Sequence, residues 1–387
     1  MKRRIGESPI HLFDNIYRGK RVLITGHTGF KGSWLCLWLR DLGASVIGFS
    51  LEPPTNPNHF DLLVSSQVLT FSSSQLPNFV SIVGDIRDAK HLNETFHTYR
   101  PEIVFHMAAQ PLVRYSYSNP VETFQTNVMG TINVLEACRN TDSVRAVVNV
   151  TSDKCYENME WVWGYRENDR MGGYDPYSAS KGCAELVTNS YRRSFFGVAQ
   201  PSLLLASARA GNVIGGGDWA DDRLIPDIMR AVSRDEKVVI RNPKSTRPWQ
   251  HVLEPLSGYL MLGQKLLEGR QEYAEGWNFG PDDESNINVE TVVKKIKECW
   301  NKISHSLQPS NPPALQSSNF HEAGLLKLDC SKAHLTLNWK PVWGFERTIS
   351  ATAQWYKEFY ENDKIMSQRD LYEYIQDAKN KKLSWTT

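Results

Sequence analysis

The sequence has no excess of charge of either sign. Its 387 residues include 44 Lys and Arg against 43 Asp and Glu, a formal net charge of +1 at pH 7. Without a basic field to attract polyanions, neither nucleic acid nor an anionic membrane is expected as a partner. Hydrophobic residues (41%) and charged residues (22%) occur at ordinary globular frequencies, which argues against a disordered, collagen-like or coiled-coil chain.

Closely spaced cysteines and long apolar runs are also missing. The six cysteines lie far apart, without the C-x2-C pairs of a zinc site or the density of a disulfide scaffold, so they are predicted to be reduced thiols. His106 and His251 have no nearby metal-ligand partner, so no metal site is predicted. The amino terminus lacks the apolar segment of a signal peptide, and no run of about 18 apolar residues occurs. These absences indicate a cytoplasmic protein that does not enter a membrane.

From residue 21 onward, short β-branched runs alternate with amphipathic stretches, the pattern of a parallel sheet covered by helices. Val128, Ile132 and Leu135 share one face of a helix predicted over 127–139, which is expected to cover the sheet. After about residue 210 Gly and Pro become frequent, which predicts a second, smaller region. Strands are predicted at 21–25, 45–50, 80–84, 103–108, 146–152 and 203–209, and a surface loop at 304–318.

The first predicted strand leads directly into a glycine-rich turn, GHTGFKG at 26–32, and then into a helical stretch. Such glycines permit a tight turn, close approach of backbone N–H groups to a pyrophosphate, and close packing of helix on sheet. Strand, turn and helix in this order predict a dinucleotide site; an ordinary glycine-rich turn is the alternative. The cofactor-binding residues predicted in this turn are Gly26, Thr28, Gly29, Phe30 and Gly32.

The acidic residue that usually binds the adenosine ribose is missing from the end of the second strand, where Glu52 is displaced. No Arg stands there to receive the 2′-phosphate of NADP either. After the third strand, Asp85 and Ile86 are candidates for the edge of the adenine site, although Asp85 is equally suited to capping the next helix. These residues leave the choice between NAD and NADP open.

Two polar motifs are predicted to meet at the carboxyl edge of the sheet, where parallel sheets bind ligands. Ser152, Asp153 and Lys154 end the fifth strand, a sequence that would also suit a turn with a surface ion pair. Tyr177 and Lys181 are four residues apart and share one face of a helix that begins near residue 176. An ammonium group beside Tyr177 is expected to lower its pKa towards the working range of a general base.

The glycine turn, the strand-end Ser-Asp-Lys and the Tyr-x3-Lys pair, in this order, resemble the extended short-chain dehydrogenase/reductase family of nucleotide-sugar enzymes. The resemblance spans roughly residues 18–355. It is most specific for the CDP-glucose 4,6-dehydratase branch, which TGHTGFKGSW at 25–34, HMAAQPLV at 106–113 and GNVIGGGDW at 211–219 resemble almost word for word. It implies a hydro-lyase that converts CDP-D-glucose to CDP-4-dehydro-6-deoxy-D-glucose. This reaction lies on the route to the dideoxysugars of bacterial surface polysaccharides such as lipopolysaccharide O-antigen.

The resemblance also implies catalytic roles. NAD would be held tightly and recycled, since the hydride removed from C4 returns to C6. Tyr177, with Lys181 beside it, would deprotonate the 4-hydroxyl, Ser152 would hydrogen-bond the 4-oxygen, and Asp153 would protonate the leaving 6-hydroxyl. Many related dehydratases carry Glu where this chain has Lys154. The lysine would therefore act either as a neutral C5 base or as a cation that stabilises the enolate, and both roles stay open.

The remaining site residues also follow from the resemblance. Arg241 and Arg247 suit a pyrophosphate, because an arginine offers two parallel N–H donors to phosphate oxygens. Either of them would also suit an ordinary surface position. Asn127 is expected to support Lys181 through a water, or else to cap locally. The remaining cofactor-binding candidates are Ala108, Ala109, Gln110 and Asn127. The substrate-binding candidates are Asn212, Arg241, Arg247 and His251.

The implied fold is α/β: a Rossmann-type doubly wound parallel sheet with a smaller, interleaved α/β substrate-binding domain. The NAD-binding domain is assigned to 15–208, with a segment near 248–270 returning to it. The nucleotide-sugar-binding domain is assigned to 209–247 and 271–360, and a polar tail to 363–387. A homodimer or homotetramer is expected, because family members associate through two long helices per subunit.

Three other functions fit parts of the same pattern. A nucleotide-sugar 4-epimerase would return the hydride to C4 and would not need Asp153 and Lys154. A dehydratase of another nucleotide sugar would share every motif, since no segment reads cytosine independently of the resemblance. A noncatalytic NAD sensor is the third alternative, and in it Tyr177 would be dispensable.

Overall fold

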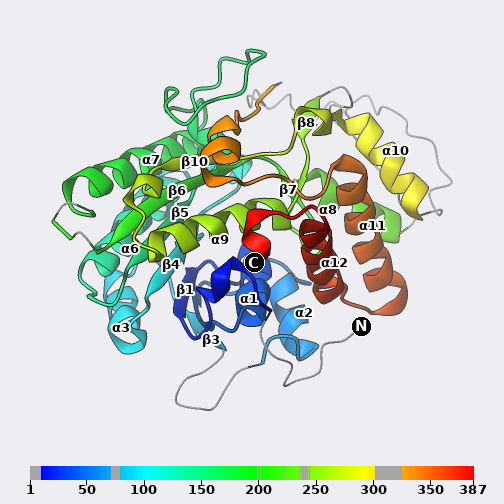
Figure 1. The fold of residues 1–387 in the computed structure, drawn as a ribbon. Coiled ribbons are helices and arrows are strands. Elements are labelled where there is room, and N and C mark those ends of the chain that lie inside the picture. Colours follow the sequence, from blue (N-terminus) through cyan, green and yellow to red (C-terminus); the bar gives the residue numbers. More distant parts are fainter. Residues whose placement is uncertain are drawn as a thin grey trace.

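The computed structural model describes residues 10–70, 79–197, 199–200, 202–221, 223–234, 236, 243, 245–300 and 325–387. At its centre lies a seven-stranded sheet in the order β10-β6-β5-β4-β1-β2-β3 (Figure 1). Neighbouring strands all pair in parallel, which confirms the predicted Rossmann-type α/β fold. The strands are β1 (Arg21–Thr25), β2 (Ser45–Ser50), β3 (Phe79–Val83), β4 (Ile103–His106), β5 (Ala146–Val150), β6 (Leu204–Ala210) and β10 (Gly276–Phe279).

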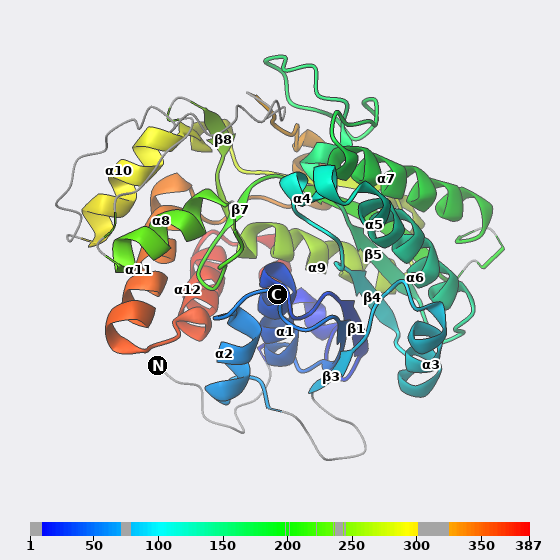
Figure 2. The same cartoon turned by 180° about the vertical axis from the view of Figure 1, so that it is seen from behind.

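The two faces of the sheet enter separate hydrophobic cores, because successive residues of a strand point to opposite sides. On β1, Val22 and Ile24 face one core and Leu23 faces the other. Figure 2 shows α3, α6 and α7 together on one side of the molecule. Helices α1 (Phe30–Asp41), α2 (His59–Ser65) and α9 (Leu253–Leu267) contribute to the first core, and α3 (Ala89–Tyr99), α6 (Gly130–Arg139) and α7 (Pro176–Ser194) to the second.

Beyond β6 the chain forms helices and short strand pairs. β8 (Thr246–Pro248) pairs with β11 (Asn286–Asn288) in antiparallel fashion, and β7 (Val213–Ile214) pairs in parallel with β9 (Gln250–His251). Figure 2 shows the later helices grouped on the side of the molecule opposite α6 and α7. These helices are α8 (Leu224–Ser233), α10 (Val289–Trp300), α11 (Phe345–Asn362) and α12 (Ser367–Asn380).

The structure departs from the prediction in two places and refines it in a third. β10 falls within 271–360, which the sequence assigns to the second region, yet it is the edge strand beside β6. The polar tail assigned to 363–387 contains α12, which packs against α1 and buries Leu371 and Tyr374. The helix predicted over 127–139 starts earlier, with a π-helical turn at Gln125–Met129. The other domain boundaries stay a prediction, and the loop at 304–318 lies outside the described residues.

None of the helices in the described ranges is both long and apolar enough to cross a membrane.

Candidate active site

The glycine turn lies between β1 and α1, at the point where the strand order of the sheet reverses. Gly26 has φ +77°, and a Cβ there would lie 2.7 Å from the backbone nitrogen of Ala108. A Cβ on Gly32 would overlap the Gly26 carbonyl, so only glycine fits either position. No side chain caps α1, which leaves its first backbone N–H groups for a ligand. These features fit the pyrophosphate of a dinucleotide.

The end of β2 lies beside this turn. The Thr28 hydroxyl is 2.5 Å from the Ser50 hydroxyl and donates to the Leu51 carbonyl at 2.9 Å. Glu52 is exposed, as its displaced position in the sequence suggests. The turn therefore meets β2 through hydroxyl groups rather than through a strand-end carboxylate.

The alternative role predicted for Asp85, capping the next helix, is wrong. Asp88 caps α3 instead, accepting from the backbone of Lys90 and His91. Asp85 accepts the Arg87 backbone N–H at 2.8 Å and pairs with the Arg87 guanidinium at 2.6 Å. Ile86 is almost fully buried against the sheet.

Asn127 sits in the π-helical turn and joins two parts of the site. Its amide nitrogen donates to the Gln110 carbonyl at 3.1 Å and to the Ser180 hydroxyl at 2.9 Å, and its oxygen accepts the Gln110 N–H at 2.8 Å. π-turns are frequent at functional sites. Asn127 thus ties the loop after β4, which contains Ala108 and Ala109, to the residue that precedes Lys181 on α7.

Helix α7 starts beside this loop, with Pro176 at its first position and Asp175 as its cap. The Asp175 carboxylate accepts the Ser178 backbone N–H at 2.9 Å and the Ser178 hydroxyl at 2.6 Å. The Tyr177 N–H donates to the Ser116 hydroxyl at 3.1 Å. These bonds fix the first turn of α7, on which Tyr177 is only 7% exposed.

The strand-end motif meets Tyr177 as the sequence predicts. The Ser152 side chain lies near enough to Tyr177 to lower the pKa of the phenol, and it donates to the Asp153 carboxylate at 2.9 Å. Asp153 is 7% exposed, and burial raises the pKa of its carboxyl above the ordinary value, although Lys154, Ser152 and Lys31 oppose this rise. A raised pKa moves a carboxyl towards the working range of a general acid.

The pKa values of the Tyr-Lys pair differ from the prediction. Burial raises the pKa of Tyr177 to about 12, although Ser152 and Arg223 oppose this rise. Burial also lowers the pKa of Lys181 to about 8. Desolvation therefore outweighs the attraction between the Tyr177 phenolate and the Lys181 ammonium that their spacing on the helix suggests.

Two cations near these groups are absent from the prediction. Lys31, in the glycine turn, interacts electrostatically with Asp153, Lys181 and Arg223, and burial and these neighbouring cations lower its pKa to about 8. Arg223 pairs with Asp218 at 2.8 Å and reaches the vicinity of Tyr177 from the other region of the chain. The position of Lys31 inside the glycine turn was an available signal. No local pattern points to Arg223.

Residues predicted for the substrate are dispersed. Asn212 follows Gly211 at the end of β6, where a Cβ on Gly211 would lie 3.0 Å from the Asp153 carboxylate. Arg247 lies on β8 and donates to the Thr246 carbonyl at 3.0 Å. Arg241 lies outside the described residues. Asn212 is therefore the substrate candidate whose neighbour in the sequence, Gly211, borders Asp153.

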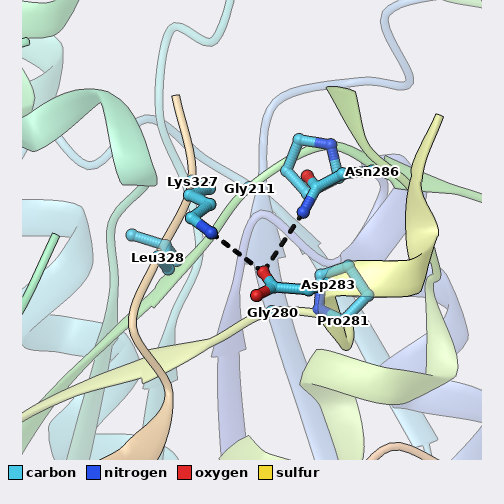
Figure 3. Close-up of a pocket in the computed structure, with 8 residues that line it drawn as sticks. Gly211, Gly280, Pro281, Asp283, Asn286, Lys327 and Leu328 are labelled. Atoms are coloured by element: carbon cyan, nitrogen blue, oxygen red, sulfur yellow. Dashed lines mark hydrogen bonds and ion pairs between the residues drawn. The ribbon is translucent and has the colours of Figure 1, made fainter. Parts of the chain in front are cut away.

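A small pocket adjoins these segments (Figure 3). Lys327 and Asn286 both point towards Asp283; the Lys327 ammonium lies 3.0 Å from its carboxylate, and the Asn286 amide donates to it at 3.4 Å. The Asn286 side-chain oxygen is buried without a hydrogen-bond partner, so it can accept from a ligand. The lining residues are Gly211, Pro248, Gly280, Pro281, Asp283, Asn286, Lys327 and Leu328.

His251 does not lie where a substrate ligand is expected. Its ring is fully buried between Trp34, 5.9 Å away, and Trp343, 4.9 Å away, and burial lowers its pKa to about 3. We therefore assign His251 to the aromatic core. Within the described ranges, no group of three or more His, Cys, Asp or Glu side chains is placed to hold a metal ion.

Known proteins are similar to this chain over most of its length. Residues 23–352 match the family model described as GDP-mannose 4,6 dehydratase. The chain is 51% identical over 367 residues to a CDP-glucose 4,6-dehydratase of Salmonella typhimurium, covering 93% of this chain and 98% of that protein. It is 26% identical over 364 residues to a dTDP-glucose 4,6-dehydratase of Haemophilus influenzae, covering 87% and 97%.

Solved structures share the fold. An epimerase, Mth375 of Methanothermobacter thermautotrophicus, aligns with TM-score 0.74 at 23% identity, covering 92% of this chain and 97% of that one. A dTDP-glucose 4,6-dehydratase of Bacillus anthracis, solved in complex with NAD, aligns with TM-score 0.69 at 20% identity, covering 89% and 98%. The glycine turn, the strand-end motif and the extent of these matches lead to one assignment: the chain belongs to the GDP-mannose 4,6 dehydratase family.

Proposed function

We propose that this protein is an NAD-dependent CDP-glucose 4,6-dehydratase that forms CDP-4-dehydro-6-deoxy-D-glucose and water. The observation that carries the proposal is the buried Asp153, which accepts a hydrogen bond from Ser152 in the vicinity of Tyr177. An epimerase needs the tyrosine but has no use for a carboxyl that acts as a general acid at C6. The similarity to the CDP-glucose 4,6-dehydratase of Salmonella typhimurium supports the choice of reaction and of nucleotide.

NAD fits the residues present. At Gly26 and Gly32 the glycine turn has no room for a Cβ, and the first N–H groups of α1 suit a pyrophosphate. When bound, NAD would supply the hydride acceptor for C4 and the hydride donor for C6. Gly26, Gly29 and Gly32 would form the cradle, with Thr28 and Phe30 beside it. Asp85 and Ile86 would border the adenine, and Ala108, Ala109, Gln110 and Asn127 the nicotinamide side.

Tyr177 would take the proton of the 4-hydroxyl. Because the pKa of Tyr177 is high, its phenol must lose its own proton with help from neighbouring cations before it can act as a base. Lys181 and Arg223 are the candidates for this help. Ser152 would hydrogen-bond the 4-oxygen, since its hydroxyl bonds Asp153 and lies near Tyr177. This position would couple oxidation at C4 to the acid that acts at C6.

Asp153 would protonate the leaving 6-hydroxyl, because burial favours its protonated form. Lys154 would either remove the C5 proton or stabilise the negative charge of the enolate. Lys31 would contribute a second ammonium near Asp153. Two lysines around one carboxyl would help to hold the charge that develops during elimination.

The substrate would extend from Asp153 past Gly211 towards the second region. Asn212 and Arg247 would meet its diphosphate, as would Arg241, since arginine pairs well with phosphate. The pocket around Asp283 and Lys327 would border the same substrate, because Gly211 and Pro248 line it.

The decisive experiment is turnover of purified protein with CDP-, UDP-, GDP- and dTDP-glucose, each product being weighed by mass spectrometry. We expect a product lighter by one water, formed fastest from CDP-glucose. An unchanged mass with inversion at C4 would instead identify an epimerase. Faster dehydration of another nucleotide sugar would contradict the choice of CDP-glucose as substrate but would support the 4,6-dehydratase reaction.

Tyr177→Phe is the matched control, because it removes one hydroxyl and keeps the ring. We expect at least a 10²-fold loss of turnover in this variant. Full activity of Tyr177→Phe would contradict the catalytic role of the tyrosine. Release of NAD from the denatured wild-type protein would establish that the cofactor is tightly held.

We also propose a homo-oligomer, either a dimer or a tetramer, and a cytoplasmic location. Large apolar side chains are exposed on the helices that family members use for association. Val121 on α5 (Pro120–Phe124) is 69% exposed, Met129 52% and Leu186 on α7 60%. All six cysteines are free, which supports a reducing compartment.

A further inference from the structure

The buried face of α7 continues beyond the Tyr-Lys pair. Tyr177, Lys181 and Glu185 follow one another at intervals of four residues, so they lie one above the other on the helix. Their exposed fractions are 7%, 6% and 4%. Tyr177 and Lys181 belong to the proposed mechanism, whereas Glu185 has no role in it. A buried carboxylate one turn from the lysine therefore needs an explanation.

Glu185 is held ionised by the sheet beneath it. It accepts from the Ser207 hydroxyl at 2.7 Å, from Arg209 Nη2 at 2.9 Å and from the Thr151 hydroxyl. Burial alone would raise the pKa of Glu185, but Arg209 and these hydrogen bonds bring it below the ordinary value. Arg192, on the next turns of α7, faces it as well. The carboxylate therefore stays negative inside the protein.

Arg209 is itself fixed on its other side. It donates to the Tyr156 hydroxyl at 2.6 Å and to the Glu167 carbonyl at 2.9 Å. The Tyr156 hydroxyl in turn donates to Asn278 on β10 at 2.8 Å. Because these bonds fix the Arg209 guanidinium, its bond to Glu185 also fixes the position of the Glu185 carboxylate.

Several groups face Lys181 from different elements. Glu185 acts from α7, Cys155 from the turn after β5, His106 from β4, and Lys31 from α1. Burial raises the pKa of the Cys155 thiol and lowers that of His106 to about 3, so both are neutral near pH 7. Lys31 is cationic and disfavours a second ammonium. In the described part of the chain, Glu185 is the negative charge that opposes both burial and Lys31.

We propose that Glu185, locked by Arg209, is a positioning residue that supplies a fixed negative charge one helical turn from Lys181. The inference rests on the proposed function only for its catalytic consequence, because the charge state of Lys181 exists without turnover. Without the carboxylate, burial and Lys31 would together favour the neutral amine. The proposed base would then lose the ammonium beside it.

The test measures the protonation of Lys181 directly. Protein labelled with [6-¹³C]lysine is titrated by NMR, and the Lys181 resonance is identified by its absence in Lys181→Arg. In Glu185→Gln we expect the pKa of Lys181 to fall by about one unit or more, since an adjacent opposite charge shifts a pKa by about that much. The alkaline limb of the pH profile of kcat should move down by the same amount.

Thr188→Val is the matched control. Thr188 lies on the same buried face of α7 and accepts a hydrogen bond from Asn149 at 2.6 Å, so the variant removes a helix–sheet bond but no charge. We expect the pKa of Lys181 to be unchanged in this variant. An equal shift in Thr188→Val would show that loosening of α7, rather than charge, is responsible.

Glu185→Gln leaves Arg209 buried and unpaired, which can prevent folding. The double variant Glu185→Gln/Arg209→Met removes both charges and avoids this cost. Arg209 is not among the groups that act on Lys181, so a lower pKa is still expected. A folded Glu185 variant with the wild-type Lys181 pKa would overturn the inference. Lack of dehydratase turnover in the wild type would instead refute the proposed function, and the titration would still be interpretable.

Discussion

Burial decides the chemistry of individual residues in this site. Tyr177, Asp153 and Lys181 all lie within the carboxyl edge of the sheet, and burial is the largest cause of the pKa shift in each. Desolvation favours neutral forms, so the carboxyl and the phenol keep their protons more strongly and the ammonium keeps its proton less strongly. The three shifts suit an acid at Asp153, but they leave Tyr177 dependent on neighbouring cations.

The elimination step can be separated from oxidation by single substitutions. We expect Asp153→Asn to lower the formation of dehydrated product by about 10² to 10⁴-fold, because the amide cannot protonate the 6-hydroxyl. Oxidation at C4 should persist, so reduced nicotinamide should accumulate on the enzyme and be detected by its ultraviolet absorbance. Failure of reduced cofactor to accumulate in Asp153→Asn would mean that the carboxyl acts before elimination.

Lys154 has two open roles that a pair of variants separates. Lys154→Ala removes both roles, so we expect turnover to fall by at least about 10²-fold. Lys154→Arg keeps a cation but cannot act as a base, because arginine stays protonated. Turnover of CDP-glucose near the wild-type rate in Lys154→Arg would identify charge stabilisation, and loss of that rate would identify the base. Full turnover of Lys154→Ala would exclude both roles.

Between elements, a buried carboxyl group joins the carboxyl-terminal part of the chain to α9. Glu254 on α9 accepts the backbone N–H groups of Val342 and Trp343 at 2.9 and 2.7 Å, and the Tyr374 hydroxyl of α12 at 2.8 Å. Burial raises the pKa of Glu254 from 4.5 to about 7 despite these bonds. α12 is thus joined to α9 by a group that titrates near neutral pH.

Linkage gives this carboxyl a pH signature. Because its pKa is higher in the folded protein, the folded state binds the proton more tightly, and the contribution to stability is lost as pH rises from 4.5 to about 7. We expect the free energy of unfolding of the wild type, relative to Glu254→Gln, to fall by about 3 kcal/mol over this range in urea titrations. Glu298→Gln, an exposed change, is the control. A pH-independent difference between wild type and Glu254→Gln would contradict the expectation.

At the scale of the whole molecule, the catalytic and apolar faces of α7 point in different directions. Tyr177 and Lys181 are buried, whereas Leu186 is 60% exposed. Val121 on α5 and Met129 in the π-helical turn are exposed as well, and both of these elements contact α7. Apolar side chains gathered on adjoining helices mark an interaction surface. Assembly through this face would leave the catalytic face of α7 buried within its own subunit.

Charge on this face should therefore block assembly. We expect Leu186→Glu/Met129→Glu to have a smaller mass than the wild type by light scattering, because a carboxylate cannot be buried unpaired at an interface. Leu335→Glu is the control, since Leu335 is 82% exposed on a different element. A double variant with the wild-type mass would exclude this face as the contact.

The sequence by itself determined the local units of this protein. Strand, glycine turn and helix follow one another within 21–41, and Tyr177 and Lys181 share a face because both lie on one helix. Such units depend on neighbours along the chain, so periodicity and turn chemistry predict them. The same logic placed Ser152, Asp153 and Lys154 at the sheet edge.

Only the tertiary structure decided which distant side chains meet. It brought Arg223 and Lys31 towards Tyr177 and Asp153, paired Glu185 with Arg209, buried His251 among tryptophans, and added β10 and α12 to the folded body. The sequence spacing of these groups carries no periodic signal. Their proximity follows from how the helices pack on the sheet, and their ionisation depends on the burial that this packing produces.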